Sequence, residues 1–200
     1  MKMLLRLLLL FFVSLPALGA TPAPDEVVRS VTDDVMQAVQ KNEALKAGER
    51  EAVMSLLEQK VLPHVDFREA TRLALGRDWR LATPAQRDQL VQQFQTLLLR
   101  IYTRSIGHYH GQTMQVQRVN APAGATDVTV RNRYLSPGRP PVSVDYAMHL
   151  TPQGWKIYDV NVDGVSIVLA FRSEFVQVVR QSGIDGLLAR LEEKNQPARP

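Results

Sequence analysis

The spacing of apolar residues changes twice along this 200-residue chain, and these changes limit the folds it can form. From residue 24 to about residue 106, apolar side chains recur every three or four residues, which is the period of an amphipathic helix. After Gly111 the period falls to two, which is typical of antiparallel strands with one polar and one apolar face. Beyond about residue 165 the helical period returns. The pattern predicts an α+β fold.

Three helices are expected early in the chain, and the first two cover about residues 24–42 and 48–62. Asp66 followed by Glu69 resembles a capping box, in which two side chains bond the free amides at a helix start. This motif predicts the start of the third helix, and Gly76 predicts its end.

The strongest helix-start signal is the sequence Thr83-Pro84-Ala85-Gln86, which combines a capping threonine, a proline at the first helical position and a glutamine three residues after the cap. It predicts a long helix to about residue 106. After the strands, the pattern predicts a helix over about 165–181 that ends near Gly183, and a short helix over 184–194.

The alternating region predicts about four antiparallel strands. Its apolar members are Met114, Val116, Val128, Val130, Tyr134, Val142, Val144, Tyr146, Met148 and Leu150. The last strand changes phase, since Trp155 and Ile157 fall on one face and Val160 and Val162 on the other. Either a β-bulge or a strand covered first on one side and then on the other would explain this change. We expect several helices on one face of a curved antiparallel sheet, enclosing an apolar pocket.

The first twenty residues have the pattern of a secretory signal peptide. Lys2 and Arg6 precede an apolar run, and small residues at Ala17 and Gly19 suit a signal peptidase. The apolar run is too short to span a bilayer, which argues against a membrane anchor. We expect cleavage after Gly19 or Ala20, a single domain over residues 21–200 and a location in the periplasm.

Composition restricts the function further. The chain has no cysteine, which excludes disulfides, a thiol nucleophile, thiolate metal sites and a lipid-modified cysteine anchor. Its net charge of +4 falls to +2 when Lys2 and Arg6 leave with the signal peptide. The remaining basic residues are scattered rather than clustered, so no nucleic acid is expected as a partner.

Catalytic motifs are mostly absent, since the chain has neither a GxxxxGK[ST] loop nor a GxSxG elbow. Ser166 stands between a strand and a helix, where it is either a nucleophile or, as the pattern favours, a helix cap. His108 and His110 have no third ligand close in sequence, so no metal is expected. Asp159 and Asp163 are either paired acids or solvated residues at a strand end.

Seven short blocks occur here in one order and cover nearly all of the expected mature chain. They are Leu62–Val65, Ala82–Arg87, Tyr109–Thr113, Gly138–Pro141, Trp155–Val160, Asp163–Ser166 and Gly183–Leu187. Together they resemble the toluene-tolerance family, also called the MlaC family. The chain departs from the family pattern at Asp163, where glutamate is frequent, and at Ala170-Phe171, where a polar residue and tyrosine are common.

The resemblance implies the phospholipid-binding component of the periplasmic Mla pathway, which maintains the lipid asymmetry of the outer membrane. Such a protein is a monomeric shuttle without cofactor or catalytic residues, and its cargo is phospholipid. Its implied partners are an outer-membrane lipoprotein–porin complex and an inner-membrane ABC transporter that bears a lipid-binding ring. The acyl tails should be enclosed and the headgroup should stay in water, because burying an unpaired polar group is costly.

We expect the pocket between the helices and the apolar strand face, with the turn at Gly164 at its mouth. The expected lining residues are Leu75, Trp79, Phe94, Leu98, Ile101, Tyr102, Val116, Val130, Tyr134, Val144, Tyr146, Met148, Trp155 and Ile157, and the expected mouth residues are Gly164, Val165 and Ser166.

Two alternatives of other classes stay open at this point. A cone-shaped isomerase or dehydratase needs a histidine or an acid that points into the cavity. The alternation places His149 and Asp145 on the polar strand face, which argues against such an enzyme. A chaperone for proteins would need an exposed apolar patch or a free strand edge rather than a closed pocket.

Overall fold

Helices cover a six-stranded sheet in the computed structural model, which describes residues 21–106, 113–119, 121, 122 and 124–196. The expected signal peptide and the pair His108 and His110 lie outside the described residues. Among the described helices, none has the length and apolar content needed to cross a membrane.

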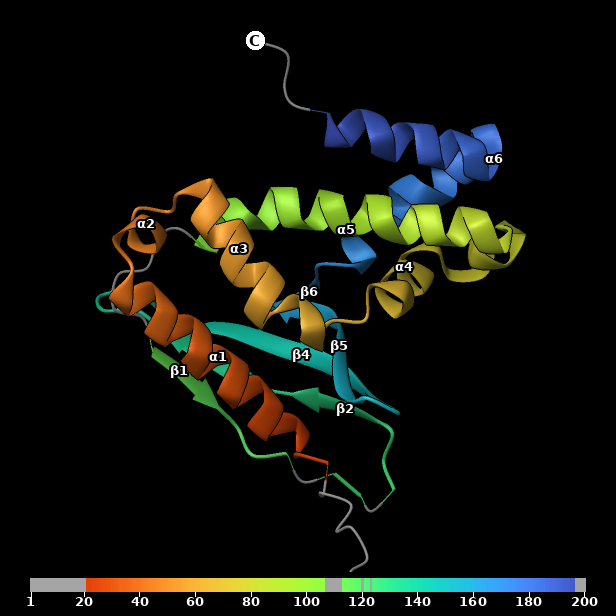
Figure 1. Ribbon diagram of the computed structural model, residues 1–200. Coiled ribbons are helices and arrows are strands. Elements are labelled where there is room, and N and C mark those ends of the chain that lie inside the picture. The colour runs from red at the N-terminus through yellow and green to blue at the C-terminus, as the bar shows by residue number, and fades with distance from the viewer. Residues whose placement is uncertain (1–20, 107–112, 120, 123, 197–200) are drawn as a thin grey trace, which may run out of the picture.

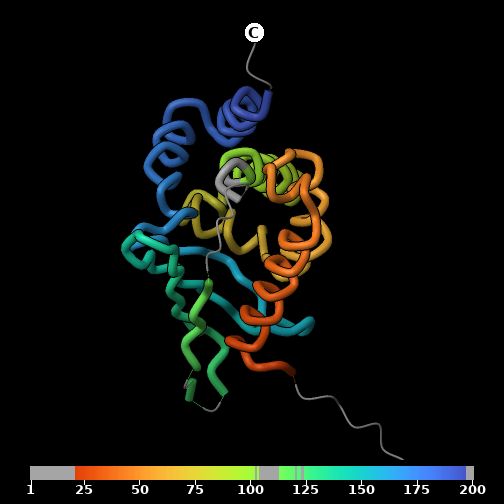
Figure 2. The backbone as a smooth tube through the Cα atoms, turned by 90° about the vertical axis from the view of Figure 1, so that its left-hand side faces the viewer, coloured from red at the N-terminus to blue at the C-terminus, as the bar shows by residue number. Residues whose placement is uncertain are grey.

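The helices are arranged so that α1 runs along the sheet, α5 crosses above it and α6 packs on the far side of α5 (Figures 1 and 2). They are α1 (Pro24–Lys41), α2 (Glu43–Lys46), α3 (Arg50–Lys60), α4 (Phe67–Leu75), α5 (Pro84–Ile106) and α6 (Arg172–Asn195). Three 3-10 helices connect them: η1 (Leu62–His64), η2 (Gly76–Leu81) and η3 (Leu169–Phe171).

Two helix starts follow the caps that the sequence predicts. At the start of α5, the Gln86 amide donates to Thr83 Oγ1 over 3.2 Å, and the Thr83 amide donates to Gln86 Oε1 over 2.9 Å. This pair is a complete capping box. At the start of α4, Asp66 Oδ1 accepts from the Glu69 amide over 2.9 Å, and Gly76 ends the helix with a φ of 58°. The predicted capping box is only half formed here, because the Glu69 carboxylate pairs with Arg72 and the Asp66 amide donates to the Ile157 carbonyl.

The strands form an antiparallel sheet in the order β1–β3–β4–β5–β6, and β2 pairs with β4 beside β3. They are β1 (Thr113–Val116), β2 (Asp127–Val130), β3 (Asn132–Leu135), β4 (Val142–Thr151), β5 (Gly154–Val162) and β6 (Val165–Ser166). The sequence predicts one strand where β2 and β3 follow each other. Arg131 separates them, and the buried Asn132 at the start of β3 donates from its Nδ2 to the carbonyls of Val130 and Val144.

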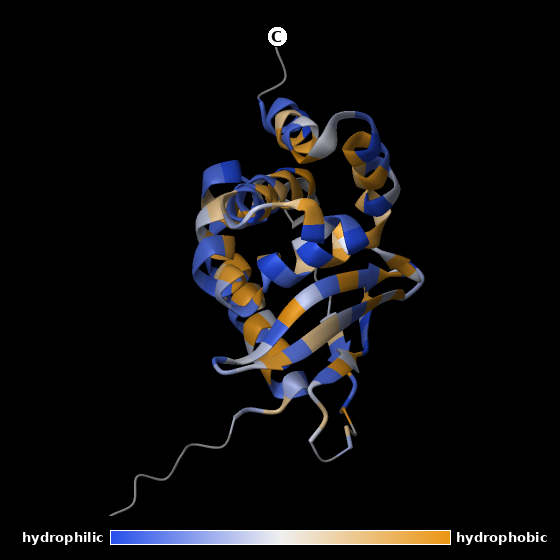
Figure 3. Ribbon diagram, turned by 90° about the vertical axis from the view of Figure 1, so that its right-hand side faces the viewer, coloured by the Kyte–Doolittle hydropathy of each residue, from blue (hydrophilic) through white to orange (hydrophobic). Residues whose placement is uncertain are grey.

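A β-bulge explains the change of phase in β5. Ala147 pairs with Asp159 and Met148 pairs with Ile157, so Tyr158 is the extra residue of β5. Because the bulge absorbs one residue, Ile157 and the later Val160 keep their side chains on the same apolar face of the sheet. The alternation along the strands is visible in Figure 3.

The prediction that a helix begins at about residue 165 is wrong. Val165 and Ser166 form the short strand β6, the 3-10 helix η3 follows, and α6 begins only at Arg172. Ser166 does cap a helical turn, since its Oγ accepts from the Leu169 amide over 2.9 Å, but this turn is η3. The predicted break near Gly183 is confirmed, because this residue has a φ of 68° inside α6.

Buried apolar residues form three clusters. The helical cluster joins α4, α5 and α6 and includes Phe94, whose ring meets the edge of Phe175 at a centroid distance of 5.2 Å. The sheet cluster lies between α1 and the strands and includes Val28 and Met148. The third cluster joins α1, α2 and α3 and includes Val53. In the sheet cluster α1 therefore covers the apolar face of the sheet, while the other two clusters mainly join helices to each other.

Candidate functional site

An apolar cavity of about 260 Å³ lies where helices α3, α4 and α5 meet strand β5. Most of its lining residues are aliphatic or aromatic, and they are Leu57, Val61, Leu62, Val65, Phe67, Ala70, Leu98, Leu99, Thr103, Ile157, Tyr158, Asp159, Val160, Ile167 and Val168. All three apolar clusters meet here, since Ala70 belongs to the helical cluster, Ile157 to the sheet cluster and Leu57 to the third.

One wall of the cavity is the segment that leads into α4. Val65 forms a parallel bridge with Ile157, and the Asp66 amide donates to the Ile157 carbonyl over 2.8 Å. Asp66 Oδ2 lies 3.0 Å from Nε2 of His149 on β4, so one carboxylate both caps α4 and contacts the sheet. Lys156 adds a hydrogen bond from its Nζ to the Pro63 carbonyl. These polar contacts fix the start of α4 against the sheet.

The opposite wall depends on the carboxylate of Asp159. Its Oδ2 accepts from the Ser166 hydroxyl over 2.6 Å, and its Oδ1 accepts from the Val168 amide over 3.1 Å. The Ile167 amide also donates to the Val160 carbonyl over 2.8 Å. Asp159 thereby holds in place the segment that contributes Ile167 and Val168 to the cavity.

The other acid, Asp163, has a separate role. Asp163 Oδ1 accepts from the Ser143 amide over 2.8 Å, and Asp163 adopts a positive φ of 47° beside Gly164 at 88°. Val165 follows with 64% of its surface exposed. The turn from Asp163 to Ser166 is therefore fixed to β4 on one side and presents an apolar side chain to solvent on the other.

We expect Asp159→Ala to lower the free energy of unfolding by about 1–3 kcal/mol, because the amide of Val168 loses its hydrogen-bond acceptor. Asp159→Asn is the matched control, since its side-chain oxygen can still accept from that amide, and it should lose less. Urea unfolding followed by circular dichroism measures both. An alanine variant as stable as the wild type would show that the carboxylate does not hold this wall.

Two of the residues expected to line a pocket, Leu98 and Ile157, line this cavity. Others lie in or against the sheet cluster, namely Val116, Val130, Tyr146, Met148 and Trp155, and others in or against the helical cluster, namely Leu75, Trp79 and Phe94. Tyr134 and Val144 are half-buried on the sheet, and Ile101 is 42% exposed. The Tyr102 side chain lies outside the described residues.

Several cavity residues are not among those expected from the sequence. Val61 and Val65 flank the 3-10 helix η1, and Phe67 and Ala70 lie on α4. Val65 belongs to the family-like block Leu62–Val65, but no period marks it as inward-facing. Its place in the cavity follows from its pairing with Ile157, a contact between distant parts of the chain.

Two tyrosines on the inner face of the sheet interact with each other. Burial raises the pKa of Tyr146 well above its ordinary value, and the neighbouring Tyr134, through its charge and a side-chain hydrogen bond, raises it further. The Tyr146 hydroxyl therefore keeps its proton in the folded protein at a pH where an unfolded chain loses it.

This shift predicts alkaline destabilisation. The contribution of Tyr146 to the free energy of unfolding is fully present below about pH 10, the pKa of a tyrosine in the unfolded chain. It is lost as the pH rises above that value, by at most about 1.4 kcal/mol per pH unit. We expect the wild type to lose more unfolding free energy than Tyr146→Phe between pH 9 and pH 11, values that bracket the tyrosine pKa of about 10. Urea titrations at several pH values measure the difference, and parallel losses in the two proteins would contradict the prediction.

Comparison with known proteins identifies the family. The model of the MlaC protein family matches residues 29–193. The chain belongs to the MlaC family. A curated relative, the intermembrane phospholipid transport system binding protein MlaC of Haemophilus influenzae, is 21% identical over 92% of this chain and 86% of its own. The toluene tolerance protein ttg2D of Pseudomonas putida is 25% identical over the same shares.

A solved structure of an MlaC-like fold carries a ligand. The phospholipid-binding protein from Ralstonia solanacearum, in complex with a phospholipid, matches with a TM-score of 0.80 and 33% identity. The match covers 87% of this chain and 97% of that protein. The predicted α+β class and the predicted family membership are both confirmed by these comparisons.

Proposed function

We propose that this MlaC-family protein binds phospholipid, with the acyl tails in the apolar cavity and the headgroup in water, and carries it between membranes. The observation that carries the proposal is the cavity itself, which lies at the junction of three apolar clusters and has an almost wholly apolar lining. The structural likeness to a phospholipid complex at 33% identity supports the same ligand class.

The energetics favour enclosed tails. Each methylene removed from water contributes about 0.8 kcal/mol, so roughly 25 methylenes of two acyl chains contribute about 20 kcal/mol. The headgroup costs several kcal/mol to bury without partners, so it stays outside. A lipid held in this way leaves slowly by itself. Release therefore requires a partner that opens the cavity or offers a continuous apolar path.

The cavity must enlarge to accept two tails. At about 30 Å³ for a group the size of a water molecule, 260 Å³ holds roughly nine such groups, far fewer than the methylenes of two acyl chains. The walls contributed by α4, by α5 and by the segment at Ile167 must therefore move away from β5. Leu98 and Ile157 stay in contact with lipid throughout, and the other inner-face residues of the sheet become accessible as the helices separate.

The proposal includes a place in the cell. We infer that residues 1–20 direct export and are cleaved after Gly19 or Ala20, so that the mature protein works in the periplasm. The partners are the outer-membrane lipoprotein–porin complex and the inner-membrane ABC transporter with its lipid-binding ring. The exposed turn at Gly164 and Val165, next to the Ile167 wall, is the point where a partner would act on the cavity.

The enzyme alternative finds no support. The comparisons match lipid-transport proteins. The side chains that an enzyme would use form structural contacts, since His149 contacts Asp66 and Ser166 donates to Asp159.

Gentle purification followed by native mass spectrometry and organic extraction tests the proposal. We expect about one two-chain phospholipid per protein, and transfer of labelled phospholipid from protein to acceptor liposomes. A matched sample of the protein unfolded and refolded without lipid provides the empty control. Recovery of a soluble metabolite in stoichiometric amount, or failure of the refolded protein to take up phospholipid, would contradict the proposal.

A further inference from the structure

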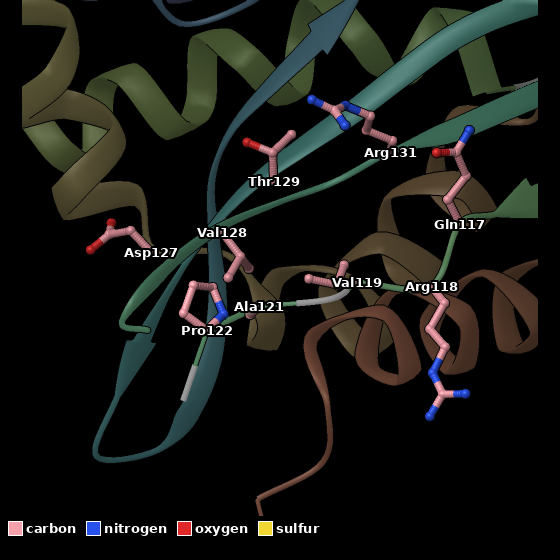
Figure 4. A pocket seen from close by; sticks show the side chains of 9 residues that line it. All are labelled: Gln117, Arg118, Val119, Ala121, Pro122, Asp127, Val128, Thr129 and Arg131. Carbon is pink, nitrogen blue, oxygen red and sulfur yellow. The ribbon is translucent and has the colours of Figure 1, made fainter. Parts of the chain in front are cut away.

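The antiparallel pairing of β1 with β3 ends before it reaches the neighbouring strand β2. The pairing of β1 with β3 continues one residue past the strand, where the Gln117 amide donates to the Arg131 carbonyl over 2.9 Å. The same register would place Val119 opposite Thr129 and Ala121 opposite Asp127. Instead the chain turns away from β2, and a hollow of about 410 Å³ separates the two segments. Figure 4 shows the hollow, with Val119, Ala121 and Pro122 on one side and β2 on the other.

The backbone of β2 has free hydrogen-bonding groups on this side. The Leu150 amide donates to the Thr126 carbonyl, which sets the phase of the ladder between β2 and β4. Since bonded and non-bonded pairs alternate in an antiparallel ladder, Val128 bonds to β4, and Asp127 and Thr129 direct their amides and carbonyls toward the hollow. Within the described part of the chain, no backbone hydrogen bond reaches these two residues from that side.

The side chains around the hollow differ in polarity between the two faces of the sheet. Val119 and Val128 pack against the sheet cluster and form an apolar floor. Thr129 and Arg131 lie on the outer, exposed face. Arg118 and Arg131 are both exposed, and the described residues offer neither of them an ion pair. Asp127 is the one acidic residue among those that line the hollow, so its two arginines leave it with a net positive charge. The hollow therefore combines an open strand edge, an apolar floor and a net positive charge.

We propose that an extended segment of a partner protein, with alternating apolar and acidic residues, binds here as an added strand along β2. Its backbone would pair with Asp127 and Thr129. Its inward residues would fill the hollow above Val128, and its outward acidic residues would lie next to Arg131. This binding site is independent of the lipid cavity, which shares none of these residues.

The free backbone groups favour a peptide over an anionic lipid surface. They recur at every second residue of β2, which is the repeat of a strand and not of a lipid headgroup array. A lipid surface would use the arginines alone and would leave the amides of Asp127 and Thr129 without partners.

The test uses a fluorescent, end-capped eight-residue peptide that alternates valine and glutamate, with a valine–lysine peptide as its counterpart. Fluorescence anisotropy should show saturable binding of the glutamate peptide and at least about tenfold weaker binding of the lysine peptide. Thr129→Pro removes an amide that faces the hollow and leaves the ladder to β4 intact, and should weaken binding at least about tenfold. Thr129→Ala keeps that amide and should bind within about twofold of the wild type.

A modified peptide gives a second readout that needs no protein variant. N-methylation at alternate positions should abolish binding in one phase and leave it nearly unchanged in the other, because only every second amide faces β2. Absence of saturable binding up to about 1 mM, or equal binding of the glutamate and lysine peptides, would overturn the proposal. So would binding to phosphatidylglycerol vesicles by the wild type, but not by Arg131→Glu, without any binding of the peptide.

Discussion

Replacing Leu98 with tryptophan should reduce the phospholipid recovered with the purified protein at least about tenfold, a loss that corresponds to about 1.4 kcal/mol or more of binding free energy. Leu98 lies on α5 and lines the cavity opposite β5, so the larger indole occupies the volume that the acyl tails need. The measurement is the molar ratio of extracted phospholipid to folded protein, by mass spectrometry after gentle purification.

Ile101→Trp is the matched control for this variant. Ile101 lies three residues further along the same helix, is 42% exposed and is not a cavity residue. It should keep its phospholipid within about twofold, since a surface substitution usually changes stability by no more than about 0.5 kcal/mol. If the two tryptophan variants retain lipid equally well, the cavity beside β5 is not where the tails bind.

Phe94→Ala should lower the free energy of unfolding by about 3–5 kcal/mol, the range for removing a buried aromatic ring. Phe94 is fully buried in the helical cluster, and its ring meets the edges of Phe171 and Phe175 at 5.2 Å. Because it does not line the cavity, the molecules that remain folded should carry a normal amount of phospholipid. Urea unfolding and lipid extraction on the same preparation measure the two quantities.

Phe94→Leu covers the case in which the alanine variant does not fold, because leucine keeps much of the buried volume. It should show a smaller loss of stability and, again, normal phospholipid content. A loss of bound phospholipid in folded Phe94→Leu would place this residue in the lipid site rather than in the core. Leu98 and Phe94 belong to the same apolar pattern of α5. Comparing the variants at these two positions therefore distinguishes a residue that lines the cavity from a residue of the core.

Local signals predict helix starts well in this protein because the groups that decide them lie within three residues of each other. Thr83 and Gln86 cap α5 reciprocally, and the Asp66 side chain alone caps α4. The same logic fails at Ser166, because a serine cap stabilises a 3-10 turn as readily as an α-helix. The start of α6 at Arg172 depends on the strand pairing of β6 with β5, which no local signal records.

The cavity is harder to predict than the fold for a related reason. Alternation identifies Val130 and Met148 as inward-facing, but it does not say that α1 covers them with Val28. The residues that do line the cavity from the other side, such as Val65 and Val168, come from connecting segments without a period. The hydrogen bond from the Asp66 amide to Ile157 holds Val65 there, and the Val168 amide donates to Asp159.

The extra residue in β5 restricts how the length of this strand can change. If Tyr158 were kept and paired regularly with Ala147, the strand beyond it would turn over. Val160 and Val162 would then point to solvent, while Asp159 and Asn161 would point toward the apolar face. Deleting Tyr158 instead leaves Val160 opposite Tyr146, so a relative that lacks the extra residue must carry its apolar residues in strict alternation through this point. Length and hydrophobic pattern in β5 are inherited together.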